Sequence, residues 1–195
     1  RSSDPGRPEF SFPPQGTPEE VDWLGAKNQI DAAVAAGVKK FVFVSSMGGT
    51  QPENFLNSIG RRPDGSGGDI LFWKRKAERY LMEQDLDFTI VHPGGLIDDA
   101  AGLRELVVGV DDELLQLKSR SVPRADVARV CCAAIDHPQA SNLAFDLASK
   151  PKDDASAKPT VDASLVFAQL DGKTYDYTTV LPDPPSIFAA DGAEL

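Results

Sequence analysis

The chain has 195 residues, of which 41% are hydrophobic and 26% charged, and its formal net charge is −10. This composition is that of a globular domain long enough to bury a core. The acidic balance argues against nucleic acid as a partner, because phosphates require clustered Lys and Arg, and it also argues against anionic membrane surfaces. No apolar run reaches the length of a transmembrane helix, so we expect a soluble protein.

The amino-terminal part predicts a loop followed by a long helix. Residues 1–16 are rich in Pro, Gly and Ser, as loops are. Thr17, Pro18 and Glu20 then supply a capping hydroxyl, a proline at the first helical position and a glutamate three residues after the cap. We expect the helix to run to about residue 36 and to end at Gly37, because glycine readily takes the left-handed conformation of a C-terminal cap.

Two apolar runs, Phe41–Val44 and Phe88–Val91, predict buried parallel strands. The residues between them, 73–84, have helical spacing of their apolar side chains. This pattern is a βαβ unit, and ligands of open α/β sheets lie beyond the carboxyl ends of the strands. There the first run is followed by Ser45, Ser46, Met47 and a Gly48-Gly49 pair, and the second by Pro93-Gly94-Gly95.

Residues 50–68 form a polar loop, which we interpret either as a lid over the site or as a mobile surface insertion. The rest of the chain predicts shorter elements. The apolar pattern predicts strands at 103–110, 113–118 and 142–147, and helices at 123–137 and 162–170. The adjacent Cys131 and Cys132 suit buried packing better than a disulfide, and no metal site is expected. We divide the chain into a loop at 1–16, one domain at 17–150, and a partly disordered carboxyl-terminal extension at 151–195.

Several motifs in one order resemble a known family. The series A-A-G-V-K-K-F-V-F-V-S-S, K-R-K-A-E-x-x-L, D-F-T-I-V-x-P-G-G-L and P-R-A-D-V-A is similar to the NmrA-like branch of the NAD(P)-binding atypical short-chain dehydrogenase/reductases. The segments V-D-W-x-G-x-K-N-Q-I-D-A-A and S-M-G-G-T look closest to plant and algal NAD(P)-binding proteins of that branch. The resemblance covers roughly residues 8–151.

The resemblance implies an α/β fold, a partial Rossmann-like doubly wound parallel sheet of which only the carboxyl-terminal portion is present. The Gly-rich turn that seats the pyrophosphate should follow the first strand of such a fold, and the chain has no such turn. Set against the family, the first three strands are missing. The strand at Phe41–Val44 would then be a bare edge, which predicts aggregation or a homo-oligomer formed through that edge.

The resemblance also assigns site residues. Classical members reduce carbonyls with Ser, Tyr, Lys and Asn, because the alkoxide left by hydride transfer must be protonated. By motif, Ser46 and Lys74 match the Ser and Lys, whereas the Tyr position is Ile70 and the Asn position is Asp22. Further cofactor contacts are expected from Met47 and from Pro93, Gly94, Gly95 and Leu96. Simpler alternatives are a surface Lys74 paired with Glu78, a Ser46 that caps its strand, a core Tyr80 and a structural His92.

These observations predict an NAD(P)H-dependent oxidoreductase or a redox sensor, with NADP favoured over NAD and with an unknown small-molecule substrate. The alternative is a non-enzymatic interaction module, or a truncated fragment that no longer binds nucleotide. A cytoplasmic and a plastid location both fit, since any transit segment would precede Arg1.

Overall fold

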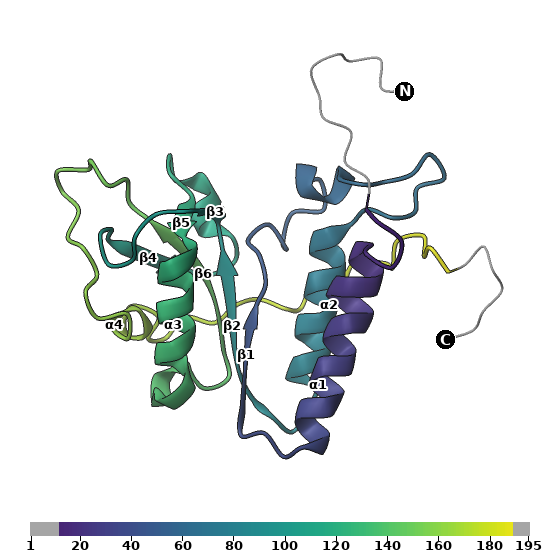
Figure 1. Ribbon diagram of the computed structural model, residues 1–195, viewed down its shortest axis with the longest axis horizontal. Coiled ribbons are helices and arrows are strands. Elements are labelled where there is room, and N and C mark those ends of the chain that lie inside the picture. Colours follow the sequence, from purple (N-terminus) through teal and green to yellow (C-terminus); the bar gives the residue numbers. More distant parts are fainter. Residues whose placement is uncertain (1–11, 189–195) are drawn as a thin grey trace, which may run out of the picture.

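A four-stranded sheet in the order β1-β2-β6-β4 forms the centre of the protein (Figure 1). The structure, a computed structural model, describes residues 12–188. Strands β1 (Lys40–Val44), β2 (Asp87–Pro93) and β6 (Leu143–Ser149) are parallel, and β4 (Leu106–Gly109) pairs antiparallel with β6. The predicted α/β fold with a mainly parallel sheet is confirmed, and β1 is an edge strand of the described sheet, as expected.

Helices cover both faces of this sheet. On one face lie η1 (Glu19–Gly25), α1 (Ala26–Ala35) and α2 (Ile70–Met82), and Figure 1 shows α1 and α2 side by side. On the other face lie α3 (Arg124–Asp136) and the short α4 (Leu165–Ala168). The smaller elements are η2 (Phe55–Ser58), β3 (Gly95–Ile97), η3 (Glu113–Gln116), β5 (Ser121–Pro123) and η4 (Pro138–Ala140).

The predicted ends of the first helical segment are confirmed. The Glu20 carboxylate accepts from the Thr17 amide at 3.1 Å, and the Thr17 hydroxyl accepts from the Glu20 amide at 3.4 Å, which is a capping box. At the other end Gly37 has φ +64°, and the Val38 amide donates to the Ala33 carbonyl at 3.0 Å. The chain therefore turns directly into β1.

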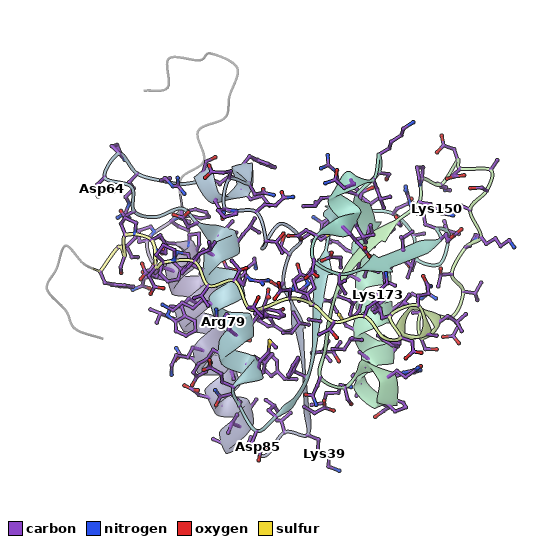
Figure 2. The ribbon with its side chains drawn as sticks, turned by 180° about the vertical axis from the view of Figure 1, so that it is seen from behind. Lys39, Asp64, Arg79, Asp85, Lys150 and Lys173 are labelled. Atoms are coloured by element: carbon purple, nitrogen blue, oxygen red, sulfur yellow. The ribbon has the colours of Figure 1, made fainter. Side chains whose placement is uncertain are left out.

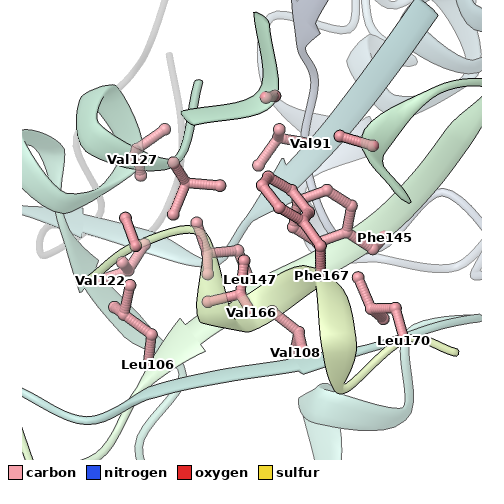
Figure 3. Packing of buried hydrophobic residues seen from close by; sticks show 14 residues of the cluster. Val91, Leu106, Val108, Val122, Val127, Phe145, Leu147, Val166, Phe167 and Leu170 are labelled. Atoms are coloured by element: carbon pink, nitrogen blue, oxygen red, sulfur yellow. The ribbon is translucent and has the colours of Figure 1, made fainter. Parts of the chain in front are cut away.

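The strand alternation sends side chains to two hydrophobic clusters, one on each face of the sheet. On the α3/α4 face, Val91 and Phe145 pack with residues of α3 and α4 (Figure 3). On the α1/α2 face, Ile90 of β2 packs with Ile30 of α1 and Leu81 of α2. Parallel strands buried on both faces need apolar residues at successive positions, which explains Phe88, Ile90 and Val91 in β2; the one polar residue among them, Thr89, donates its hydroxyl to the Ala140 carbonyl.

The segment beyond residue 150 contributes to both clusters. In α4, Phe167 is 1% exposed and meets the ring of Phe145 edge to face, with centroids 6.0 Å apart (Figure 3). Residues 171–188, which we call the carboxyl-terminal strap, contain no helix or strand and cross to the α2 face, where Tyr175 is buried. The domain boundary at 150 stays a prediction, but the described part of the predicted extension packs into the core.

Three expectations need correction. The strand predicted at 113–118 is wrong: η3 forms there, because Asp112 has φ +62° and the Glu113 amide donates to the Val110 carbonyl, which turns the chain. The first apolar run is not buried on both faces, since β1 lies at an edge and Val44 is 44% exposed. The two-stranded sheet of β3 and β5 was not predicted, because three-residue strands carry no periodic signal.

Of the predicted loop at 1–16, residues 1–11 lie outside the described residues, as do residues 189–195 of the predicted extension. The polar loop at 50–68 includes η2, and the Asn57 carboxamide oxygen accepts from the Leu71 amide at 3.0 Å. That contact caps the start of α2, so the loop is tied to the fold at its far end.

Phe167→Ala is expected to lower the free energy of unfolding by about 3–5 kcal/mol, because it leaves a cavity between α4 and β6. Leu165→Ala, in the same helix but at a residue that is 58% exposed, should change it by less than about 1 kcal/mol. Urea unfolding followed by circular dichroism measures both. Equal small effects would mean that the segment after residue 150 is not part of the core.

Candidate functional site

The carboxyl ends of β1, β2 and β6 lie together at one edge of the sheet, as the βαβ pattern predicts. Backbone hydrogen bonds extend the pairing into the loops: the Ser45 amide donates to the Val91 carbonyl at 2.8 Å, and the Met47 amide to the Pro93 carbonyl at 3.2 Å. The Gly94 amide likewise donates to the carbonyl of a β6 residue at 2.9 Å. The loops after all three strands are therefore held against one another.

Lys74 and Asp22 form an ion pair. The ammonium nitrogen of Lys74, on α2, lies 2.7 Å from Oδ1 of Asp22, on η1, and both side chains are mostly buried. These are the positions of the Lys and of the Asn in the expected constellation. The simpler alternative, a Lys74 paired with Glu78, is wrong, because the Glu78 carboxylate faces the sheet. Ile70, at the position of the Tyr, is the first residue of α2 and carries no proton to donate.

Ser46 and Met47 are occupied locally. The hydroxyl of Ser46 donates to the Met47 carbonyl at 3.0 Å, and no hydrogen bond between residues 12 and 188 joins Ser46 to Lys74. The side chain of Met47 is buried with Leu114 and Ala148. These contacts support packing for Met47, and they leave the cofactor roles assigned to both residues as predictions.

The Pro93–Leu96 turn divides into a closed half and an open half. A Cβ on Gly94 would stand 1.7 Å from the carbonyl oxygen of Arg120, so only glycine fits this position. A Cβ on Gly95 would meet nothing within 4 Å, and Leu96 is exposed. The part of the turn that faces open space is therefore Gly95 and Leu96, in β3.

Asp112 binds the loop after β1 at Gly48 and Thr50, a role that sequence reasoning missed. Its carboxylate accepts from the Gly48 amide at 2.6 Å, from the Thr50 amide at 2.8 Å and from the Thr50 hydroxyl at 2.6 Å. Asp112 is buried, and Gly48 has φ +102°. The amides of Gly48 and Thr50 are therefore satisfied from within the chain. An Asp-Asp turn was visible in the sequence, but its partner lies more than 60 residues away.

A buried charged cluster lies beneath the same edge. His92, on β2, has Nε2 3.2 Å from Oε2 of Glu78, on α2, and Nδ1 3.6 Å from Oδ1 of Asp146, on β6. Glu78 also accepts from the hydroxyl of Tyr177 in the carboxyl-terminal strap at 2.8 Å and from the hydroxyl of Ser45. The expectation of a structural His92 agrees with this burial. Tyr80 is half-buried and donates its hydroxyl to an aspartate of α1.

The cluster sets its own protonation states. Burial lowers the pKa of His92, but the carboxylates of Glu78 and Asp146 outweigh this and raise it to about 9. Burial acts to raise the pKa of Glu78, yet the imidazolium of His92 and the hydroxyl donors hold it below its ordinary value. At neutral pH His92 is therefore a cation that faces two acidic side chains. Its charge offsets the desolvation of Glu78, whereas burial outweighs it at Asp146 and raises the pKa of that carboxyl.

No group of three or more His, Cys, Asp or Glu side chains within residues 12–188 is arranged to hold a metal ion. Over the same residues, no helix is long and apolar enough to cross a membrane.

Raising the pH from 6.5 to 9.5 should lower the free energy of unfolding by up to about 3 kcal/mol. The pKa of His92 is about 9 in the folded chain and 6.5 as the ordinary value, so its stabilisation is complete below pH 6.5 and is lost through pH 9. In His92→Asn the protein should be less stable but should lose this pH dependence. Urea unfolding at four pH values measures it, and a parallel decline in both proteins would contradict the assignment.

A comparison with protein families matches residues 10–138 to the NAD(P)H-binding domain family. An uncharacterized chloroplastic protein of Arabidopsis thaliana is 51% identical over 168 residues, which cover 86% of this chain and 49% of that protein. Sanguinarine reductase of Eschscholzia californica is 46% identical over 163 residues, which cover 84% of this chain and 57% of the reductase. The chain thus spans about half the length of these relatives.

A solved structure, a putative NAD-dependent epimerase/dehydratase from Bacillus halodurans, superposes with a TM-score of 0.60 at 25% identity, covering 87% of this chain and 66% of the other. The oxidoreductase ylbE of Lactococcus lactis gives a TM-score of 0.57 at 24% identity over 82% of this chain and 64% of the other, which shows the shared fold. The family match extends over more than half of the chain and agrees with the parallel sheet and its loops. The chain therefore belongs to the NAD(P)H-binding domain family of Rossmann-type proteins.

Proposed function

We propose that this chain forms the nicotinamide-ribose side of the site of an NAD(P)H-dependent reductase. The observation that carries the proposal is the 2.7 Å pair of Lys74 and Asp22. The family resemblance implies that these are the positions of the Lys that holds the ribose hydroxyls and of the Asn of the proton relay. Such a site requires that the two side chains, which come from different helices, lie close together in space.

The residues present fit one part of a dinucleotide. Lys74 is partly accessible and supplies ammonium donors for ribose hydroxyls, while Gly95 and Leu96 offer open backbone for a flat ring. A pyrophosphate needs unpaired backbone donors at a helix start. Within residues 12–188 the candidate donors after β1, at Gly48 and Thr50, are already bound by Asp112. The chain's contribution is therefore the ribose side.

The chemistry follows from what this chain can and cannot do. A bound nicotinamide cofactor would supply hydride to a small-molecule substrate. Lys74 would orient the ribose, and its positive charge would stabilise negative charge that develops nearby. Since Ile70 has no proton to give, we propose that the proton comes from water. The similarity to sanguinarine reductase supports a reductase, and the similarity to a chloroplastic protein supports a plastid location.

A non-enzymatic interaction module is the other candidate that the sequence left open. The family match over residues 10–138 and the retained Lys74–Asp22 pair are observations in favour of cofactor binding. No specific contact favours the interaction module, so we do not propose it.

Lys74→Ala should weaken NADPH binding by about tenfold or more, because it removes a charged donor to the ribose. Lys118→Ala removes the same charge from an exposed position in the loop after η3 and should leave binding unchanged. Titration followed by NADPH fluorescence measures both, and a parallel titration with NADH tests the proposed preference for NADP. Absence of saturable binding by the wild-type chain, or equal affinities of the two variants, would refute the proposal.

The exposed edge of β1 is proposed to pair with a second copy of the chain. An unpaired edge presents open backbone donors and acceptors to another strand. Val44→Lys, at the exposed end of β1, should shift the protein toward monomer in light scattering, whereas Val38→Lys, at a similarly exposed residue before the strand, should not. A wild-type chain that is a monodisperse monomer with cooperative melting would rule out this pairing.

A further inference from the structure

A pocket of about 260 Å³ lies on α2, away from the residues assigned to the cofactor. Its walls come from α2, from Trp23 of η1, from the loop after β1 and from residues 179–183 of the carboxyl-terminal strap. Figure 2 shows the strap crossing α2 beside the labelled Arg79. Ser46, Lys74 and the 93–96 turn do not line this pocket, so it is separate from the proposed ribose site.

The walls are suited to a flat apolar ring. Trp23, Phe72 and Tyr80 supply aromatic surface, and Val180 and Leu181 of the carboxyl-terminal strap supply aliphatic surface. Aromatic rings favour offset or edge-on contact with another ring. A dry cavity of about 150 Å³ is enough to hold benzene. A pocket of 260 Å³ therefore has room for one or two fused rings and a small polar substituent.

The charges in the pocket favour an anion. Arg75, Lys76 and Arg79 line it together with the carboxylates of Glu83 and Asp183, which leaves one positive charge in excess. Lys76 is neutralised by Asp183 at 2.6 Å. Neither Arg75 nor Arg79 makes an ion pair with any residue between 12 and 188, but Arg75 is held by the Asp176 carbonyl and the Tyr177 ring, which leaves Arg79 for a ligand. A ligand carboxylate would satisfy this guanidinium with two parallel hydrogen bonds.

The roof of the pocket is held in place on both sides. On one side the guanidinium of Arg75 lies 4.4 Å from the centroid of the Tyr177 ring and donates to the Asp176 carbonyl. The hydroxyl of Tyr177 in turn donates to the Glu78 carboxylate. On the other side Ser186 donates to the Glu19 carboxylate at 2.6 Å. Between these anchors Val180 remains 64% exposed. The fold thus fixes the roof and leaves apolar surface at the rim of the pocket.

We propose that this pocket binds a small aromatic carboxylate, with its ring against Trp23 and Phe72 and its carboxylate on Arg79. The site is independent of the dinucleotide, because no residue is shared between them. Neutral rings of the same size would gain the apolar contact but not the charge-assisted hydrogen bonds, so they should bind more weakly.

The test adds 2-naphthoate, or the neutral 2-naphthalenemethanol, to the whole chain. Isothermal titration calorimetry measures the affinity of each probe, and amide chemical shifts locate the residues that it contacts. The acid should bind at least about tenfold more tightly than the alcohol, and shifts should concentrate at residues 179–183 and along α2. Arg79→Gln should weaken binding of the acid about fivefold to tenfold and leave the alcohol unchanged. Arg124→Gln, which removes an exposed arginine on α3, is the matched control and should change neither.

A second variant tests the pocket in case Arg79→Gln unfolds the protein. Val180→Asp adds a carboxylate at an exposed position of the rim, so it should weaken binding of the acid more than that of the alcohol while the melting temperature stays unchanged. Equal affinity of the two probes, or insensitivity of the acid to Arg79→Gln, would overturn the proposal. Shifts confined to residues outside the pocket would overturn it too. The outcome does not depend on NADPH binding, which is measured separately.

Discussion

The buried carboxylate of Glu78 is the junction on which the rest of the structure depends. It joins α2 to β2 through His92, to the end of β1 through Ser45, and to the carboxyl-terminal strap through Tyr177. His92 compensates the charge of this carboxylate and the two hydroxyls hydrogen-bond it, and a buried charge that loses its partner is costly. The packing of α2, the spacing of two neighbouring strands and the course of the strap are therefore coupled.

The contacts of Glu78 also limit which side chains are left for the candidate cofactor site. Because Glu78 is committed to the sheet, Lys74 on the same helix is left for Asp22 on η1. Because Asp112 binds the loop after β1, the amides of Gly48 and Thr50 are used for structure. At the carboxyl edge, the part of the 93–96 turn that faces open space is Gly95 and Leu96. The proposed role of this chain, the side of the site that would hold a ribose and a flat ring, rests on the Lys74–Asp22 pair and on this turn.

The carboxyl-terminal strap gives the fold a second surface. It covers His92 with the ring of Tyr175, at a centroid distance of 4.6 Å, and then roofs the pocket beside Arg79. The same arginine-to-tyrosine stacking that holds the strap also brings positive charge to the pocket wall. The proposed ribose site and the aromatic-anion pocket therefore use different sets of residues on η1 and α2, with Asp22 and Lys74 in the first and Trp23 and Arg79 in the second.

The sequence by itself determined the order and type of most elements, because hydrophobic periodicity and capping residues act locally. The capping box at Thr17 and the cap at Gly37 were predicted, and so were β1, β2, α2, α3 and β6. Motif order also indicated the family and the exposed edge of β1. Only the tertiary structure decided the partners. The pairs Lys74–Asp22, Gly48–Asp112 and Glu78–Tyr177 join residues 52 to 99 positions apart. Local pattern carries no information about which distant carboxylate a donor will meet, and that choice is made by packing and desolvation.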